Sequence, residues 1–337
     1  MKKFALPAAL VLIGLLCIGG IAFAIRLISS NVNIPAGSTK TPTLLTTDNN
    51  TNAITATATK FTGNYPEPTG KIVFTCQIQG DEVCIMNPDG SGWQQLTDSP
   101  LASFNASLSP DGKKVVYVVT DGKNSEIYDL EIAAKKTNQL TDLKKNLGSP
   151  EISPDNKYII FHYRSGNSNT AIWVMNRDGK KPHEFYSSPG KDAHDATWSA
   201  DGKQILFALG KGENNKLYIM DFAGGDPQLV NNTIDTRGRS DWSGALISFD
   251  QGNPFLHNVY VMKTDGNGLQ QITAGNNSQG ASLSPDGMWI AFTAYIDTSN
   301  SSQGLSSCEI YIMHTDGTDI RRLTNNNYCD YQPRWGN

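Results

Sequence analysis

The sequence predicts an all-β fold, a six-bladed β-propeller over residues 70–337, preceded by an N-terminal transmembrane helix and a flexible linker. Two observations predict the propeller: a short phrase recurs at the period of a four-stranded blade, and the end of the chain completes a copy that residue 70 begins. A third observation, a long apolar run near the N-terminus, predicts the membrane helix.

Residues 1–28 are expected to be the membrane anchor. After Lys2 and Lys3, an apolar run extends from Phe4 to Ile25. As a helix it would cover about 33 Å, enough to cross a hydrocarbon core of roughly 30 Å. The two lysines favour a cytoplasmic N-terminus, so we expect a single-pass protein of the bacterial cell membrane with its propeller on the extracytoplasmic side.

Two alternatives for this segment remain open. Ala22-Phe23-Ala24 has the A-x-A pattern of a cleaved signal peptide, which would make the chain secreted. Cys17 suggests a lipoprotein, although Leu16 stands where a small residue is needed. In all three cases the rest of the chain is expected to be exported.

Residues 29–69 are expected to form a linker. They are rich in Ser, Thr, Asn, Ala and Pro and contain few large apolar residues. Such a segment cannot bury enough surface to offset the entropy lost on ordering. It is typical of a flexible tether.

The region after the linker repeats one phrase, usually a Ser-Pro-Asp-Gly turn followed by a period-2 apolar strand. Glycine supplies the positive φ that residues with side chains resist. A second phrase of the type E-I-Y-x-M then leads to an Asp-Gly hairpin turn, as in residues 309–317. The common serines lie 41 to 46 residues apart, the period of a four-stranded blade; they are Ser109, Ser153, Ser199, Ser243 and Ser284.

The two ends of the repeated region supply one further copy. Residues 332–337 read QPRWGN and residues 70–74 read GKIVF; joined, they form the complete phrase. The C-terminal strand is therefore expected to be the inner strand of the blade that begins at Lys71. This pairing would close the ring and remove a free sheet edge.

Composition excludes one broad class of function. Charged residues make up 18% of the chain and the net charge is −4. A protein that binds the nucleic-acid backbone would present a basic face. We therefore expect no nucleic-acid partner.

The phrase P-x-W-S-P-D-G-K-x-I-x-F, followed by E-I-Y-x-M-x-x-D-G, resembles the WD-like PD repeats of the TolB-like propeller family. The resemblance covers residues 70–337, with a degenerate copy at 241–249 where Ser-Gly-Ala replaces Ser-Pro-Asp-Gly. TolB itself carries an α/β domain ahead of its propeller, whereas this chain has a linker and an apolar segment there. The resemblance thus implies a fold, and fold alone does not give function.

Four exported cysteines permit three pairings. Cys76 and Cys84 flank a predicted hairpin, while Cys308 and Cys329 belong to loops expected on one face of the propeller. We expect the disulfides Cys76–Cys84 and Cys308–Cys329. Cross-pairing and free thiols remain as alternatives.

The loops before the inner strands are expected to surround the mouth of the central channel. Polar side chains on a rigid scaffold can bind a peptide, a sugar or a cation at little entropic cost. They can equally cap strand ends and contact water. The candidate binding residues are Asp192, His194, Asp195, Asp241, Asp330 and Tyr331.

Trp198, Trp242 and Trp335 occupy the same position of the repeat, at the end of an inner strand. Carbohydrate stacking would be one use of such residues. Packing between blades explains their recurrence better, since the repeat places each ring at the same point of a blade.

No enzyme chemistry is predicted. The five histidines lack metal-ligand spacing, and G-x-S-x-G is absent from the sequence. Only His194 stands where oligogalacturonate lyases, which have related blades, place metal-binding histidines. We expect no cofactor and no catalytic site, and a binding platform for an envelope or cell-surface protein; the alternative is a polysaccharide-binding or lyase-like propeller.

Overall fold

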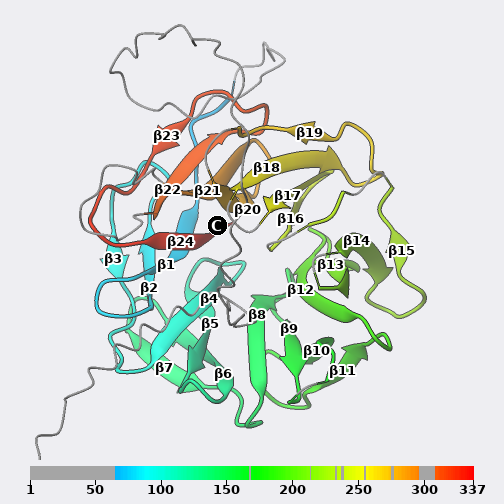
Figure 1. Cartoon of the computed structure of the whole chain (residues 1–337). Helices are drawn as coiled ribbons and strands as arrows, with labels where there is room; N and C mark the ends of the chain where they lie inside the picture. The colour runs from blue at the N-terminus through cyan, green and yellow to red at the C-terminus, as the bar shows by residue number, and fades with distance from the viewer. Residues whose placement is uncertain are drawn as a thin grey trace, which may run out of the picture. The chain divides into compact units, whose positions relative to one another are not determined.

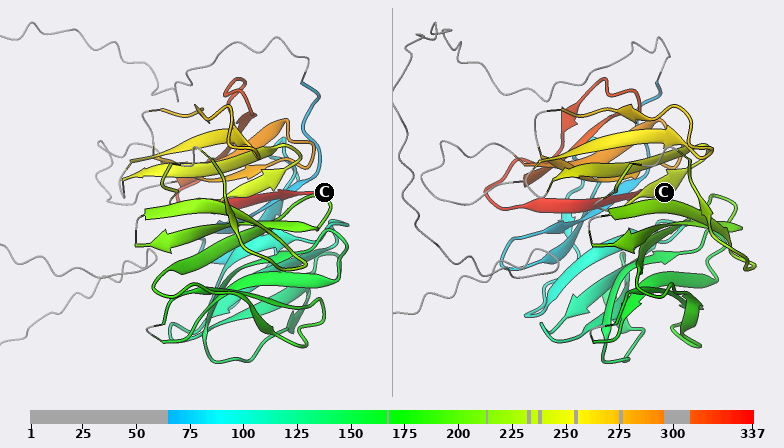
Figure 2. Two further views of the ribbon diagram at one scale, coloured as in Figure 1. Left: turned by 90° about the vertical axis from the view of Figure 1, so that its right-hand side faces the viewer. Right: turned by 45° about the vertical axis from the view of Figure 1, so that its right-hand side comes forward.

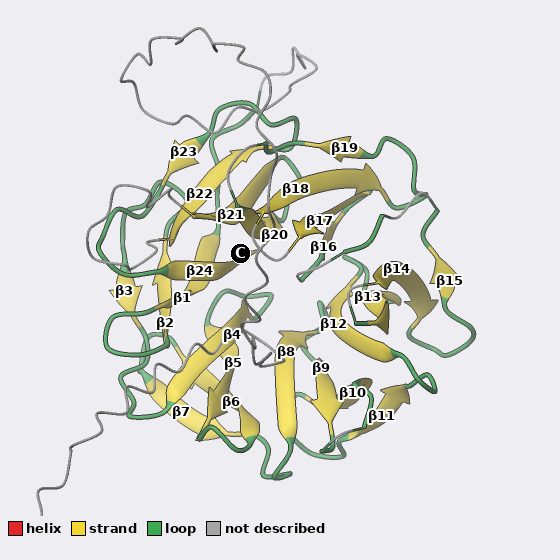
Figure 3. Cartoon of the chain, in the orientation of Figure 1, coloured by secondary structure: helices red, strands yellow, loops and turns green. Residues whose placement is uncertain are grey.

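The structure is a computed structural model that describes residues 65–166, 168–212, 214–231, 234–236, 239–253, 256–274, 277–295 and 308–337. These residues form strands, turns and loops and include no helix, so none that could cross a membrane (Figure 3). The expected membrane anchor, and the expected linker up to residue 64, lie outside the described residues. The all-β prediction is confirmed for the described part.

The strands follow one another in groups of four. The first strand of each group lies nearest a central axis, and the sheets stand around that axis (Figure 1). Figure 2 shows neighbouring sheets packed face against face. Three groups are separate sheets: β12 (Asp192–Trp198), β13 (Gln204–Lys211), β14 (Asn214–Asp221) and β15 (Gln228–Leu229); β16 (Asp241–Ser243), β17 (Leu246–Asn253), β18 (Leu256–Lys263) and β19 (Gln270–Gln271); β20 (Ser278–Leu283), β21 (Trp289–Tyr295), β22 (Cys308–His314) and β23 (Arg321–Arg322).

Two further groups are joined into one eight-stranded sheet by a single parallel pair, Ser125 with Asn146. Within each group the pairing is antiparallel. The strands are β4 (Ala102–Leu108), β5 (Lys114–Thr120), β6 (Ser125–Glu131) and β7 (Lys136–Gln139), then β8 (Asn146–Ile152), β9 (Tyr158–Arg164), β10 (Ala171–Asn176) and β11 (His183–Tyr186).

The remaining sheet contains both ends of the described chain, in the order β24-β1-β2-β3. The C-terminal strand β24 (Asp330–Gly336) pairs antiparallel with β1 (Lys71–Cys76), which pairs with β2 (Glu82–Met86) and then β3 (Gln94–Gln95). Ile72 lies opposite Trp335 in this ladder. The two segments that the sequence joins into one phrase are thus hydrogen-bonded neighbours.

The repeated serine shapes the turn that follows each inner strand. Ser109 Oγ donates to Asp111 Oδ1 at 2.6 Å and accepts the Lys114 backbone N–H at 2.9 Å. The same pair of bonds recurs at Ser153, Ser199 and Ser284. In the degenerate copy no aspartate follows Ser243, and its hydroxyl donates to the Pro285 carbonyl instead, at 3.0 Å.

The apolar core lies between the sheets. One cluster combines Ile72 and Phe74 of β1 with Trp289 of β21 and Ile310 of β22, all almost fully buried. Similar clusters lie between the other neighbouring sheets. Each sheet therefore needs its neighbours to bury both of its faces.

The structure contains the two expected disulfides, Cys76–Cys84 and Cys308–Cys329. The first crosses from β1 to β2. The second connects the start of β22 to the residue that precedes β24, and so ties the last strand to its neighbouring sheet.

Residues 65–69, which the sequence assigns to the linker, pack on the sheet of β20–β23. The Tyr65 ring stacks on His314 with centroids 3.7 Å apart. The Pro66 carbonyl accepts the Trp289 indole N–H at 3.0 Å, and Glu67 pairs with Arg321 at 3.0 Å. The described end of the expected linker is therefore packed against this sheet.

Candidate functional site

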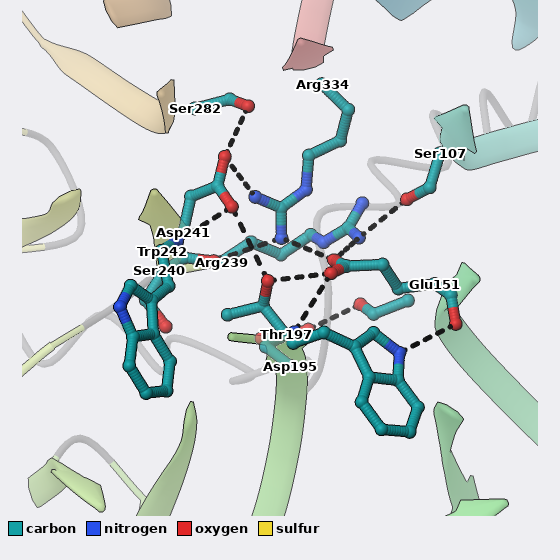
Figure 4. A network of polar contacts seen from close by, with 12 residues as sticks. Ser107, Glu151, Asp195, Thr197, Arg239, Ser240, Asp241, Trp242, Ser282 and Arg334 are labelled. Atoms are coloured by element: carbon teal, nitrogen blue, oxygen red, sulfur yellow. Dashed lines mark hydrogen bonds and ion pairs between the residues drawn. The ribbon is translucent and has the colours of Figure 1, made fainter. Parts of the chain in front are cut away.

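Six equivalent residues meet at the axis, one from each inner strand. Each stands two positions before the repeated serine or its counterpart, close to the end of its strand. Figure 4 shows them pointing toward one another. They are Ser107, Glu151, Thr197, Asp241, Ser282 and Arg334.

Arg334, on β24, joins the two acidic members of this axial network. Its Nη1 lies 3.2 Å from Asp241 Oδ2, and its Nη2 lies 3.6 Å from Glu151 Oε2. Nη2 also donates to the Ser240 carbonyl at 3.0 Å. Only 5% of Arg334 is exposed, so these interactions are shielded from water.

Each axial carboxylate also accepts neutral hydrogen bonds from the next sheet. Glu151 Oε1 accepts the Thr197 hydroxyl at 2.7 Å and the Trp198 backbone N–H at 3.1 Å. Asp241 Oδ2 accepts the Ser282 hydroxyl at 2.6 Å and the Leu283 backbone N–H at 3.0 Å. Adjacent sheets are therefore linked at the axis by hydrogen bonds to side-chain carboxylates as well as by apolar packing.

A second arginine enters the axis from the segment before β16. Arg239 Nη2 donates to Ser107 Oγ at 3.2 Å and lies 4.0 Å from Glu151 Oε2. Burial, together with the charge of Arg334, lowers the pKa of Arg239 to about 9. Burial and the nearby Asp241 carboxylate raise the pKa of Glu151, although Arg334 acts in the opposite direction. The two cations and two anions nearly balance.

A histidine cluster lies nearer the start of the inner strands, with His194 and Asp195 on β12 and His162 on β9. Asp195 of β12 has a φ of +53°. Its carboxylate accepts the hydroxyl of Ser149, lies 2.9 Å from His194 Nδ1 and 3.7 Å from His162 Nδ1. A left-handed residue recurs at this point of four other inner strands and coincides with an interruption of the ladder; these residues are Asn105, Ser149, Gly280 and Gln332.

The charges of this histidine cluster support one another. Burial raises the pKa of Asp195, but the interactions with His162 and His194 outweigh burial and hold it well below its usual range. Burial lowers the pKa of His194, but the hydrogen bond to Asp195 outweighs it and the net pKa is raised. Each partner therefore favours the charged form of the other.

The other predicted residues make different contacts. Asp192, at the start of β12, accepts the Thr170 backbone N–H at 2.7 Å and lies 3.3 Å from Arg164. Asp330 is fully buried and accepts the Asn326 side-chain N–H at 2.6 Å; burial raises its pKa to about 6. Burial and the neighbouring Asp81 raise the pKa of Tyr331.

The structure thus brings only His194 and Asp195 together among the six predicted residues. Asp241 belongs to the axial network, while Asp192, Asp330 and Tyr331 contact other groups. Sequence reasoning did not select Glu151 or Arg334. Aligning the repeats on their serine would have placed Glu151, Asp241 and Arg334 in one column.

No group of three or more His, Cys, Asp or Glu side chains arranged to hold a metal ion is found within the described ranges. The axial carboxylates are occupied by arginines, hydroxyls and backbone N–H groups. The arrangement stabilises a rigid axis and leaves the partly exposed His162, His194 and Arg164 at the end where the inner strands begin.

Comparison with known proteins gives consistent results. A family model described as the TolB beta propeller domain matches residues 59–308. The Tol-Pal system protein TolB of Francisella tularensis subsp. tularensis (strain WY96-3418) is 39% identical over 85 residues, 25% of this chain and 19% of that protein. TolB of F. tularensis subsp. holarctica (strain OSU18) is 26% identical over 201 residues, 45% of this chain and 44% of that protein.

The chain therefore spans less than half the length of these curated relatives. Among solved structures, TolB from Acinetobacter baumannii matches with a TM-score of 0.68 and 22% identity, over 79% of this chain and 66% of that one. At that identity the structural likeness supports the fold alone. Because the family model covers most of the chain, and the described strands agree with it, this protein belongs to the TolB β-propeller family.

Proposed function

We propose that this chain is an extracytoplasmic, non-catalytic β-propeller that serves as a platform for an envelope protein, held at the bacterial cell membrane by its N-terminal segment. Membership of the TolB propeller family carries the proposal, since the relatives it matches are named as Tol-Pal system proteins. The apolar run of residues 4–25 supports the anchor.

We further infer that the propeller has six blades and is closed by strand pairing. The equivalent positions of the six inner strands and the ladder between β24 and β1 support this inference. A closed ring suits a platform because it fixes its loops before a partner arrives, which lowers the entropic cost of binding.

The proposed contact surface is the channel mouth, where the inner strands begin. We keep Asp192, His194, Asp195, Asp241, Asp330 and Tyr331 as candidates, but their exposure differs. His194 and Asp192 have side chains 20% and 23% exposed, and Arg164 beside them is 46% exposed. Asp330 is fully buried. Direct contact is therefore assigned to Asp192 and His194, with Asp195 holding His194 in place.

The balanced charges at the axis support a non-catalytic role. A general base needs a carboxylate or imidazole within reach of substrate. Glu151 and Asp241 are instead bonded to Arg334, Thr197 and Ser282. They contribute to the rigidity of the ring.

The test is photo-crosslinking in native membranes with the full-length chain, followed by mass spectrometry. We expect one envelope protein to be captured reproducibly, and the double variant Asp192→Ala/His194→Ala to reduce its capture about tenfold. Lys203→Ala serves as the matched control, because Lys203 lies in the exposed turn after β12, at the opposite end of the strand from Asp192. Undiminished capture by the double variant would contradict the assignment of the mouth, and turnover of pectic oligomers would contradict the non-catalytic role.

A further inference from the structure

The junctions between neighbouring sheets are filled in different ways near the ends of the inner strands. Between the sheets of β8–β11 and β12–β15, aromatic side chains fill this space. Phe222 lies 4.6 Å from the Trp198 ring, 5.3 Å from Tyr158 and 5.4 Å from Phe185, measured between centroids. The junction is closed by direct packing.

The next junction, between the sheets of β12–β15 and β16–β19, lacks this filling. Thr264 takes the place of Phe222. The backbone N–H of each donates to a carbonyl in the turn that follows the inner strand of its own sheet. Gln204 takes the place of Tyr158, and Trp242 that of Trp198. A hollow of about 580 Å³ results, lined by all three residues. Its volume falls in the range of ligand-binding sites.

Trp242 differs from its two repeat equivalents. The indole N–H of Trp198 donates to the Glu151 carbonyl of the preceding sheet, and that of Trp335 donates to the Thr69 carbonyl. Trp242 donates to Gly244 of its own turn, at 2.9 Å. Its ring packs against the apolar cluster between the two sheets and also lines the hollow. The prediction that these tryptophans pack between blades is confirmed for all three.

The equivalent position accepts an arginine elsewhere in this chain. Arg177 corresponds to Phe222 and Thr264, because its backbone N–H bonds to the Lys157 carbonyl. Its Nη1 lies 3.2 Å from Asp129 Oδ2 across the junction of β4–β7 with β8–β11, and its side chain is 17% exposed. A junction of this kind can thus hold one guanidinium against a carboxylate of the neighbouring sheet.

The described lining of the hollow contains carboxylates. Asp221 and Asp226 come from the sheet of β12–β15, and Asp265 comes from the turn after β18. None of the described lining residues is Lys or Arg. Elsewhere Arg321 lies 4.7 Å from the centroid of the Trp289 ring and pairs with Asp319. The hollow repeats that combination of tryptophan and carboxylate without its arginine.

We propose that this hollow is the docking site for an arginine side chain on an extended segment of a protein partner. Its guanidinium stacks on Trp242 and bonds to Asp226 and Asp265, in the space that Phe222 and Arg177 fill at other junctions. A planar guanidinium satisfies both surfaces at once, which the point charge of lysine does not. The proposal rests on the protein-binding role above but uses a surface at the opposite end of the inner strands.

The first experiment measures binding of a capped Gly-Arg-Gly peptide to the full-length chain by saturation-transfer NMR. The matched probe is the same peptide with citrulline, which keeps the shape and removes the charge. We expect saturable binding of the arginine peptide and about tenfold weaker binding of the citrulline peptide. Equal binding of the two peptides, or saturable binding of neither, would overturn the proposal.

The second experiment fills the hollow. Thr264→Phe rebuilds the packing seen at Phe222, and should abolish peptide binding while leaving the melting temperature equal or higher. Asp226→Asn/Asp265→Asn, on exposed turns, should weaken binding about tenfold without unfolding the chain. Unchanged binding in both variants, or tighter binding of a neutral oligosaccharide than of the peptide, would refute an arginine site. Because the peptide is measured in the absence of an envelope partner, its binding tests this site independently of the mouth assignment.

Discussion

The axial network and the histidine cluster share the inner strands β8 and β12 but are built differently. In the axial network, the side chains of Arg334 and Arg239 are 6% and 9% exposed, and those of Glu151 and Asp241 are 17% and 14% exposed. In the histidine cluster, His162 and His194 are 25% and 20% exposed beside Asp195. Water therefore reaches the imidazoles of the histidine cluster more readily than the guanidinium groups of the axial network, whereas the carboxylates of the two clusters are similarly exposed.

This difference assigns different consequences to the two clusters. A buried charge that loses its partner carries the full cost of desolvation, so the axial network is sensitive to any deletion. A partly exposed imidazole can be rehydrated, so the stability that the histidine cluster contributes depends mainly on pH. The axial network is therefore expected to govern stability and the histidine cluster its pH dependence, although the two lie only a few residues apart.

The largest expected effect comes from the centre of the axial network. Arg334→Ala removes the cation between Glu151 and Asp241 and should lower the free energy of unfolding by about 3–5 kcal/mol. Urea unfolding followed by tryptophan fluorescence measures it. The matched control is Arg164→Ala, whose half-exposed pair with Asp192 should cost less than about 1 kcal/mol. Equal losses in the two variants would remove the distinction between buried and exposed pairs.

The two disulfides give the next largest effect and test how the last strand is held beside that network. In the chain-entropy model, opening Cys308–Cys329, separated by 21 residues, should cost about 3.4 kcal/mol. Opening Cys76–Cys84, separated by 8 residues, should cost about 2.6 kcal/mol. Double Cys→Ser variants and thermal unfolding check both values. A larger loss at Cys76–Cys84 would show that loop length does not set the order.

The sequence was sufficient for the elements that repeat. The serine turn, the apolar alternation and the joined phrase at the two ends predict where β24 and β1 lie, because each part has a local physical cause. Cys76 and Cys84 could be paired because they flank one hairpin. Repetition carries this information even where one copy, at Ser243, is degenerate.

The axial network could not be predicted from the sequence in the same way. Its six members share a position but not a residue type, so chemistry alone does not reveal them. Arg334 meets Glu151 only because distant inner strands approach one axis. The hollow beside Trp242 is also a tertiary property, since it depends on Gln204 and Thr264 failing to fill a space that Tyr158 and Phe222 fill one junction earlier.

The pH response should distinguish the histidine cluster from the axial network. The pKa of His194 is raised in the folded state. Its pairing with Asp195 therefore stabilises the fold fully below the unfolded pKa of about 6.5, and this contribution is lost as pH rises through the higher folded pKa. We expect His194→Gln to cost about 1 kcal/mol at pH 5.5 and progressively less toward pH 8.

The matched variant for this titration is Asp195→Asn. Asparagine tolerates the left-handed φ of this position, so the backbone is kept while the charge is removed. In that background burial, which lowers the pKa of His194, is the largest remaining influence, so the loss caused by His194→Gln should no longer be greater at pH 5.5 than at pH 8, measured by urea unfolding. A loss that stays greater at pH 5.5 in the Asp195→Asn background would assign the titration to a different pair.

The smallest expected effect concerns a carboxylate that belongs to neither cluster. Asp330 is fully buried, none of its partners among the described residues is a cation, and burial raises its pKa to about 6. A raised carboxyl pKa means that the unfolded state releases its proton first, so stability falls as pH rises from about 4 to about 6. Asp330→Asn removes this ionisation, keeps a partner for Asn326, and should leave the chain equally stable or more stable by about 1 kcal/mol at pH 7. Urea unfolding at pH 4.5 and 7 checks it: a loss of several kcal/mol at pH 7 would mean that Asp330 has a counter-charge, as Asp195 and Asp241 do.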